Sequence, residues 1–205
     1  MPTGFLGPKL NSLVIIRRTG SHGFRAIPTI ETSRLLLRGW RDSDIAPWVA
    51  MNADSRVMEF FLRTYDRATA ESFAALARAD LERDGFGWWV VEEKNGSPFV
   101  GVISLQAVPF EAAFTPANEI GWRFVFDKWG HGYATEGARA ALDFGFSQLA
   151  WREVIAMTSL LNVRSQLVME RLGMARNPDD DFDHPRIPEG HRLRRHVVYR
   201  IRRSS

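Results

Sequence analysis

Residues 119–135 decide the fold of this chain: Glu119-Ile120-Gly121-Trp122-Arg123-Phe124-Val125-Phe126-Asp127-Lys128-Trp129-Gly130-His131-Gly132-Tyr133-Ala134-Thr135. Apolar residues alternate as far as Phe126, which predicts a strand, and a glycine turn follows it. Beyond the turn, helical spacing predicts an amphipathic helix with a buried stripe of Ala138, Leu142, Phe146 and Leu149. A strand that passes through small residues into a helix leaves backbone N–H groups and the positive end of the helix dipole free at the turn. The stretch therefore predicts an anion site, with a phosphate-bearing ligand as its obvious occupant.

The residues after the two glycines exclude two common phosphate motifs. No Lys-Ser or Lys-Thr follows Gly132, so the turn is not a nucleoside triphosphate loop, and no third glycine completes the dinucleotide fingerprint. A Gly-x-Gly pair alone is equally typical of any turn that needs a positive φ, so a plain turn is the alternative at this point.

The composition is that of one globular domain. A chain of 205 residues with 45% hydrophobic and 25% charged residues can bury a sizeable core. It has no cysteine, which excludes disulfides, thiolate metal sites and a cysteine nucleophile. No apolar run approaches the ~20 residues of a membrane span, so no membrane partner is expected. A disulfide-free chain without a cleavable signal is expected in the cytoplasm.

The net charge of +3 is unevenly distributed. Residues 1–28 contain no acidic residue but several arginines, so we expect a poorly ordered basic extension there, with a transit peptide as the alternative, and a folded domain over residues 29–205. A second basic cluster is expected to be a solvated strand edge, because a nucleic-acid surface would interleave its charges with exposed aromatic residues. This cluster consists of Arg192, Arg194, Arg195, Arg200, Arg202 and Arg203.

Periodicity and chain breakers place the remaining elements. Apolar alternation predicts strands over residues 34–40, 88–93, 99–105, 119–126, 153–158 and 196–201, and Asn95-Gly96 predicts a hairpin turn. Helical spacing and capping residues predict helices after Ser43, over residues 69–81, after the glycine turn, and between Asn162 and Gly173. Residues 176–193 have the composition of a polar loop. This order predicts one mixed sheet with helices on both faces.

Three stretches give the chain a family resemblance. They are residues 31–38 with Trp40 and Asp44, the turn Trp129-Gly130-His131-Gly132-Tyr133-Ala134-Thr135-Glu136, and residues 162–165 with Glu170-Arg171-Leu172-Gly173-Met174. Together they resemble the GNAT superfamily of acyl-CoA-dependent N-acetyltransferases, in particular the Rim-type branch that acetylates the α-amino groups of ribosomal proteins. Gly132 and Ala134 match the family's pyrophosphate loop, whereas Trp129 stands where that loop has Arg or Gln. The resemblance covers about residues 31–202.

The resemblance implies a fold and an activity. The fold is a single GNAT-like α/β (mixed α+β) domain with a central mixed, largely antiparallel sheet of about six or seven strands and helices on both faces. The activity is the transfer of an acetyl group from acetyl-CoA to a primary amine, either a protein N-terminal α-amine or a small-molecule amine, by direct attack in a ternary complex. Acetyl-CoA is then a co-substrate, and no tightly bound cofactor is expected.

This chemistry needs a base, because an amine with a pKa of about 8 to 10 is mostly protonated at neutral pH and a protonated amine cannot attack a thioester. Glu119 begins the strand before the turn, and alternation places it on the face of Gly121 and Arg123. In the resembled family a glutamate near this place often acts through a water, so Glu119 is the candidate base. The alternative is that Glu119 pairs with Arg123 along the same face.

A general acid would help the coenzyme thiolate to leave, although a thiol of pKa ~8.5 leaves readily without one. Many relatives use a tyrosine as this acid where this chain has Met169. In the Rim-type branch a serine one turn earlier is the suggested substitute, and it corresponds to Ser165. The alternative is that Ser165 bonds the pantetheine or its own helix backbone.

The remaining expected site residues belong to the coenzyme and acceptor pockets. The coenzyme contacts are the strand amides of Phe124, Val125 and Phe126, the turn residues Gly130, His131, Gly132, Tyr133, Ala134 and Thr135, and Asn162, for which plain helix capping is the alternative. Asp183 and His184 in the late loop, with Trp48, Phe60 and Phe61, are candidates for the acceptor pocket, and core packing is the alternative for the aromatic residues. His184, His191 and His196 match no zinc spacing, so no metal site is expected.

Two other functions remain open to the sequence. A non-catalytic acyl-CoA-binding sensor would keep the ligand and use Glu119 only structurally. A basic nucleic-acid-binding module would bind with an affinity that falls steeply with salt; we expect no nucleic-acid partner. The oligomeric state is open, and a homodimer is compatible with the sequence.

Overall fold

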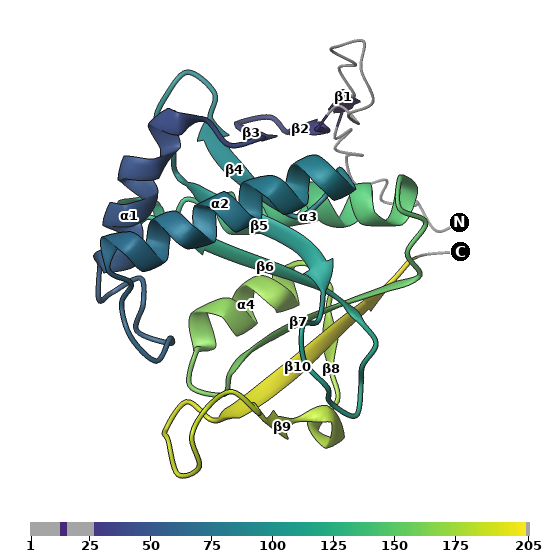
Figure 1. Ribbon diagram of the computed structural model, residues 1–205. Helices are drawn as coiled ribbons and strands as arrows, with labels where there is room; N and C mark the ends of the chain where they lie inside the picture. The colour runs from purple at the N-terminus through teal and green to yellow at the C-terminus, as the bar shows by residue number, and fades with distance from the viewer. Residues whose placement is uncertain (1–12, 16–26, 204–205) are drawn as a thin grey trace, which may run out of the picture.

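The computed structural model describes residues 13–15 and 27–203, which form one mixed sheet with helices on both faces (Figure 1). The strands are β1 (Leu13–Ile15), β2 (Thr29–Glu31), β3 (Leu35–Arg38), β4 (Trp88–Glu93), β5 (Gly101–Ala107), β6 (Asn118–Phe124), β7 (Glu153–Ser159), β8 (Ala175–Arg176), β9 (Phe182–Asp183) and β10 (Arg195–Arg202). The helices are α1 (Ile45–Ala53), α2 (Arg67–Asp84), α3 (Tyr133–Ser147) and α4 (Val163–Arg171), with 3-10 turns at Asp42–Asp44, Phe126–Lys128 and Pro178–Asp180.

The strands lie in the order β1-β2-β3-β4-β5-β6-β7-β10-β8, with β9 paired to β10. Every pair is antiparallel except β6 with β7, so the mixed, largely antiparallel sheet is confirmed. The sheet is larger than the six or seven strands expected, because β1, β2, β8 and β9 have only two or three residues each. Strands this short have no alternation by which a sequence pattern could reveal them. Two of them, β8 and β9, lie at residues 175–176 and 182–183, largely within the predicted polar loop.

Two neighbouring tryptophans on β4 show how the layers are arranged. Trp88 packs edge-on against Phe73 of α2, while Trp89 packs edge-on against Phe144 of α3, with ring centroids 5.2 and 5.5 Å apart. Since successive side chains on a strand point to opposite faces, α2 covers one face of the sheet and α3 the other. Figure 1 shows α2 lying across the near face of the sheet, beside α1.

The parallel strands β6 and β7 are paired at only one position. Their register consists of Glu119 with Ile155, whereas β6 pairs with β5 from residue 118 to residue 124. The two strands therefore separate beyond Glu119 and leave a gap in the sheet. The predicted glycine turn lies at the end of β6, so this gap leads directly to the start of α3.

A buried ion pair joins β3 to the entrance of α1. The guanidinium of Arg38 donates to both carboxylate oxygens of Asp44, at 2.8 and 2.9 Å, and both side chains are at most 5% exposed. Glu92 also accepts from Arg38, at 2.6 Å. These contacts explain why Arg38 and Asp44 occur together at the start of the domain.

We expect Asp44→Ala to lower the free energy of unfolding by about 3 kcal/mol, because it leaves the buried Arg38 charge with Glu92 as its remaining acidic partner. Asp42→Ala is the matched control, since the Asp42 side chain is 95% exposed and its pair with Arg78 is a surface pair; its loss should stay within about 0.5 kcal/mol. Urea denaturation of both variants measures the difference. Equal losses would show that burial of the pair contributes nothing.

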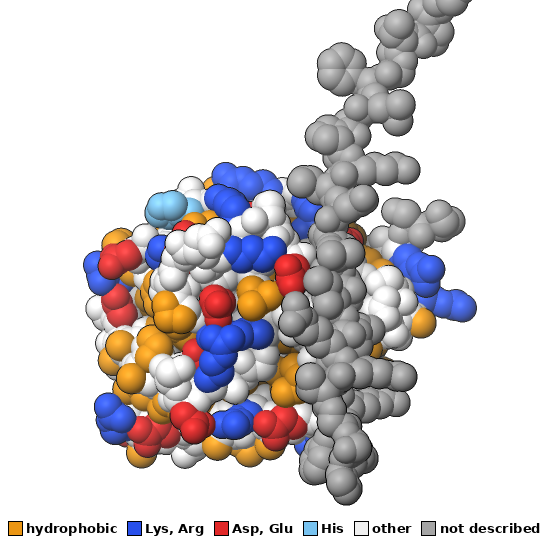
Figure 2. Space-filling view, turned by 90° about the horizontal axis from the view of Figure 1, so that it is seen from above, with side chains coloured by type: hydrophobic (Ala, Val, Ile, Leu, Met, Phe, Trp, Pro, Cys, Tyr) orange, Lys and Arg blue, Asp and Glu red, His pale blue; other side chains and the backbone are white. Residues whose placement is uncertain are grey.

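Most of the basic extension expected over residues 1–28 lies outside the described residues, so its state stays a prediction. Within it the structure places strand β1, which pairs with β2 in the register Leu13 with Glu31. No helix in the described part of the chain is long and apolar enough to cross a membrane. On the face that Figure 2 shows, basic and acidic side chains are interleaved and no continuous basic field forms.

Candidate active site

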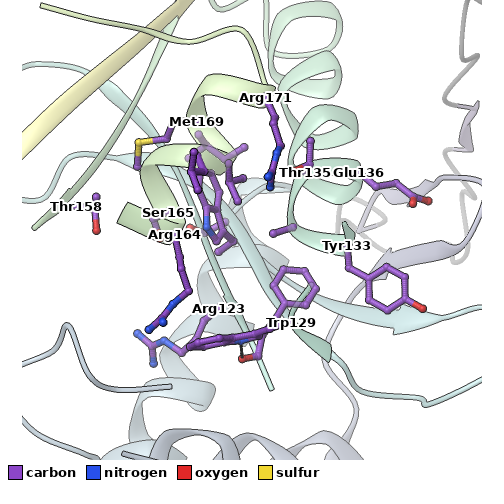
Figure 3. A pocket seen from close by; sticks show the side chains of 18 of the residues that line it. Arg123, Trp129, Tyr133, Thr135, Glu136, Thr158, Arg164, Ser165, Met169 and Arg171 are labelled. Carbon is purple, nitrogen blue, oxygen red and sulfur yellow. Dashed lines mark hydrogen bonds between the residues drawn. The ribbon is translucent and has the colours of Figure 1, made fainter. Parts of the chain in front are cut away.

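A cavity of about 1280 Å³ occupies the gap between β6 and β7. Its walls come from β6, the glycine turn, the start of α3, the end of β7, α4 and the loop around Phe60. Figure 3 shows Arg164 and Ser165 of α4 across from the start of α3, while the Tyr133 ring points away from α4. The cavity therefore joins the predicted anion site to the strand that carries Glu119.

The glycine turn is open and its amides are unused. Gly130 and Gly132 both have φ of +79°, a conformation that favours glycine. The first helical hydrogen bond of α3 runs from Glu136 N–H to the carbonyl of Gly132 at 3.0 Å. Among the described residues, no N–H group of residues 130–135 donates to another protein group. All six of these residues line the cavity, so their free amides are available to an anionic ligand, and the anion site itself stays a prediction.

Glu136 lies in the first turn of α3, where its charge could repel a phosphate. It is held by the turn between β2 and β3: Thr32 Oγ donates to it at 2.6 Å, and the backbone and Nε of Arg34 donate at 3.0 and 2.7 Å. Burial raises the pKa of Glu136, but these hydrogen bonds and one from Ser33 outweigh it and lower the pKa below its ordinary value. Figure 3 shows Glu136 directed away from the other labelled side chains. Its negative charge is therefore neutralised by Arg34.

Trp129, which stands where the resembled loop has Arg or Gln, fixes the turn against β6. Its indole N–H donates to the carbonyl of Phe124 at 2.9 Å, and the guanidinium of Arg164 lies 4.8 Å from its ring centre. An indole donor can thus hold the loop on the strand, while the amides that face the cavity stay free. No sequence pattern indicated this contact.

The three expected strand amides have different positions. Phe124 lines the cavity, whereas Val125 N–H donates to Val100 at 3.0 Å and Phe126 belongs to a 3-10 turn, so β6 ends two residues earlier than predicted. Leu105 N–H donates to the carbonyl of Gly87, the residue before β4, so the opposite residue Ile120 directs its N–H and carbonyl away from β5. By alternation the backbone N–H and carbonyl groups of Trp122 and Phe124 also point away from β5. These backbone groups face the gap beside β7.

Glu119 lines the cavity and is half-buried. Gln106, directly opposite on β5, donates to its carboxylate, and Glu119 does not pair with Arg123, so the alternative considered for this residue does not hold. Burial raises the pKa of Glu119 above its ordinary value of 4.5, although Gln106 and the charge of Arg186 work in the other direction. A carboxylate whose pKa moves toward neutrality is better suited to accept a proton.

Ser165 and Asn162 form one hydrogen-bonded unit at the start of α4. Asn162 Oδ1 accepts from Ser165 N–H at 3.2 Å, which confirms Asn162 as the helix cap. The Asn162 amide donates to Ser165 Oγ and to Thr158 Oγ, both at 3.0 Å. Because Ser165 Oγ is already an acceptor there, its own proton is free to be donated. Both residues line the cavity.

The acceptor-pocket candidates separate into three groups. Phe60 and Phe61 line the cavity, and Trp48 is fully buried with its indole bonded to Ala70, so it is a core residue. Asp183 pairs with Arg194 and Arg195, and the His184 ring packs at a tilt against the His196 ring, with ring centroids 4.9 Å apart. Neither Asp183 nor His184 lines the cavity.

Several polar residues that line the cavity were not predicted as site residues, among them Ser104, Arg123 and His196. The sequence placed Arg123 on the face of Glu119 but gave no sign that it would be buried.

Comparisons with known proteins agree with this geometry. The family model described as an acetyltransferase (GNAT) domain matches residues 34–175. The FsC-acetyl coenzyme A-N(2)-transacetylase of Aspergillus fumigatus is 31% identical over 157 residues, which are 73% of this chain and 66% of that protein.

Solved structures share the fold. A GNAT-family acetyltransferase from Bacillus anthracis is 26% identical with a TM-score of 0.70, over 85% of this chain and 98% of that one. RimJ of Mycobacterium smegmatis, solved with CoA-disulfide, is 20% identical with a TM-score of 0.64, over 82% of this chain and 81% of that one. The Rim-type protein is thus similar in fold.

Proposed function

Since this chain belongs to the GNAT acetyltransferase family and is an N-acetyltransferase that uses acetyl-CoA as its co-substrate, we propose that its acceptor is a primary amine, either a protein N-terminal α-amine or a small-molecule amine, which attacks the thioester directly. The observation that carries this proposal is the continuity of one cavity from the free amides of residues 130–135 to the carboxylate of Glu119. Coenzyme and base would then meet at the gap between β6 and β7.

The coenzyme fits this gap in one direction. Its pyrophosphate would accept hydrogen bonds from the amides at residues 130–135, where the helix dipole also favours negative charge. The pantetheine would extend along the backbone groups of Trp122 and Phe124 that face away from β5. Basic residues Arg139, Arg164 and Arg171 line the same side of the cavity. The thioester would then lie near Glu119 and Ser165.

The reaction removes two protons from the ammonium nitrogen and exchanges the C–S bond of the thioester for a C–N bond. Glu119 takes a proton from the ammonium group, directly or through a water, and the free amine attacks the thioester carbonyl carbon. As the new C–N bond forms, the C–S bond breaks and the electron pair leaves on the coenzyme sulfur. The Ser165 hydroxyl can donate a proton to that sulfur, which the departing amine proton replaces through solvent. The products are an N-acetyl amide and free CoA.

The nucleic-acid-binding alternative predicts an unpaired basic surface. The arginines of the C-terminal cluster pair with acidic residues: Arg200 with Asp180 and Glu153, and Arg202 with Glu153. Paired charges favour a solvated strand edge over a nucleic-acid surface.

The other alternative, an acyl-CoA-binding sensor, would share the coenzyme site with the enzyme, so turnover alone distinguishes the two. The location in the cytoplasm and the oligomeric state stay predictions.

A screen for free thiol release tests the proposal. Acetyl-CoA is incubated with the protein and a library of small amines and N-terminal peptides, and CoA binding is measured separately by calorimetry. We expect saturable thiol release with at least one class of amine, together with the N-acetyl product by mass spectrometry. CoA binding without turnover on any amine would favour the sensor instead.

A further inference from the structure

Arg123 is a buried cation without an acidic partner. Its side chain is 93% shielded from solvent, since the residue is only 7% exposed, and among the described residues no carboxylate forms an ion pair with it. One terminal nitrogen donates to Asn52, while Nε has no acceptor within the described residues. Burying an unpaired charge costs several kcal/mol, so a chain that keeps one gains something from it elsewhere.

Aromatic rings surround this guanidinium on the protein side. It lies 4.1 Å from the ring centre of Phe61, 5.5 Å from that of Trp48 and 5.7 Å from that of Tyr65. Rings hold a guanidinium in place but accept no hydrogen bond comparable to that of a carboxylate. Burial lowers the pKa of Arg123 to about 10, against a smaller effect of Tyr65 in the other direction, so the group stays charged at neutral pH.

A second unsatisfied polar atom belongs to another residue that lines the same cavity. Ser104 on β5 is 1% exposed, and its hydroxyl has no hydrogen-bond partner in the part of the chain that the structure describes. It is directly opposite Gly121, where an added Cβ would meet Ser104 Oγ at 3.0 Å, so both point to the face shared by Glu119 and Arg123. A side chain at position 121 would therefore crowd the Ser104 hydroxyl. Native proteins leave few buried polar groups unsatisfied, and two in one cavity indicate a ligand that bonds them.

The order of charges along β6 indicates what that ligand carries. Glu119, the proposed base, and Arg123 lie four residues apart on one face, about 13 Å along the strand, with Ser104 between them. The cavity thus offers an anionic group toward the amine end of an acceptor and a cation with a free hydroxyl beyond it. One edge of a guanidinium, formed by Nε and a terminal nitrogen, matches the two oxygens of a carboxylate.

Resting on the proposed acetyl transfer, we propose that the acceptor is an amine that also carries a carboxylate, which Arg123 and Ser104 bind while the amine faces Glu119. Arg123 is then a specificity-determining residue of the acceptor pocket. The same arrangement disfavours polyamines, because Arg123 would repel a second ammonium group. Removing the carboxylate from the acceptor would leave both polar groups unpaired again.

Matched acceptor pairs test this assignment on the intact protein. Each pair differs only in a carboxylate or a carboxamide: β-alanine with β-alaninamide, 4-aminobutyrate with 4-aminobutanamide, and short peptides with a free or amidated C-terminus. Rates are corrected for the free-amine fraction of each compound. We expect kcat/KM for the carboxylate member of at least one pair to be tenfold or more above that of its amide. Turnover of amines with no preference in any pair would overturn the assignment.

Substitutions locate the preference. Arg123→Gln should reduce it to within about twofold, mainly through a higher KM for the carboxylate member, and Arg123→Lys should restore part of it. Ser104→Ala should reduce it several-fold. Arg83→Gln is the control, because Arg83 is exposed on α2 and pairs with Asp80 and Asp84 away from the cavity. A purely structural Arg123 would instead lower the rates of both members equally, which would contradict the assignment.

Binding separates a failure of this inference from a failure of the proposed function. The melting temperature of the CoA-bound protein is measured with each acceptor. Carboxylates that raise it in the wild type but not in Arg123→Gln support the anion subsite even if no amine is acetylated, and in that case acetyl transfer to these amines is wrong. Carboxylates that raise neither melting temperature, or both equally, overturn the subsite whatever the turnover.

Discussion

Glu119→Gln is expected to lower kcat by about 10²- to 10⁴-fold at neutral pH while the dissociation constant of CoA stays within twofold of the wild type. General-base catalysis contributes a factor of this size, and glutamine is nearly isosteric with glutamate but cannot accept the amine proton. The coenzyme site should be unaffected, because the free amides that would bind the pyrophosphate lie at residues 130–135, beyond the end of β6. Steady-state thiol release and CoA calorimetry give the two quantities.

The pH dependence of the same variant identifies the group. Burial raises the pKa of Glu119, so its carboxylate gains a proton, and the wild type loses its base, as the pH falls through a value above 4.5. The ratio of wild-type kcat to Glu119→Gln kcat should therefore fall toward one in acid, and the titration of the acceptor amine cancels from this ratio. A ratio that stays constant with pH, or a kcat that is unchanged in the variant, would show that Glu119 is not the base.

Gly132→Asp is expected to weaken CoA binding by about 10²-fold or more, whereas Gly132→Asn should weaken it far less. Asn and Asp both tolerate the left-handed conformation that Gly132 adopts at φ +79°, so the two variants differ mainly in charge. A Cβ at this position meets only the guanidinium of Arg34, at 3.5 Å, and otherwise open space. The added carboxylate would stand where the pyrophosphate charge is expected, and close like charges repel strongly.

Calorimetry with CoA and with a dephosphorylated pantetheine measures this effect. The Asp variant should lose affinity for CoA more than for pantetheine, since only CoA carries phosphate groups, and kcat at saturating acetyl-CoA should remain near that of the Asn variant. If the two variants bind CoA equally, the turn does not hold the anionic part of the coenzyme.

The sequence predicted the faces of the elements better than their partners. Alternation along β6 correctly placed Glu119 and Arg123 on one face, and the glycine spacing correctly placed an open turn before α3. The alternative contact between Glu119 and Arg123 does not form, because a cross-strand neighbour such as Gln106 lies about 5 Å away whereas a residue four positions along the strand lies about 13 Å away. Pairing between strands decides such contacts, and periodicity does not encode it.

The unpredicted features are tertiary in the same sense. The bond from the Trp129 indole to Phe124 depends on how the turn folds back on the strand. The burial of Arg123 depends on α1 and on the loop that carries Phe61 and Tyr65, all distant in the sequence. A charged residue in a strand pattern is typical of a solvent-facing position, so only the packed helices reveal this cation as a buried one.

The single parallel pair between β6 and β7 leaves the two halves of the sheet weakly joined. A coenzyme bound in that gap would connect the two halves where strand pairing is missing. Because a ligand that binds only the folded state stabilises it by about 2.7 kcal/mol at a hundred times its dissociation constant, the resistance of this protein to proteolysis should rise and fall with the supply of acetyl donor. In a starved cell the unoccupied enzyme would then be degraded sooner, so its abundance would follow the metabolic state.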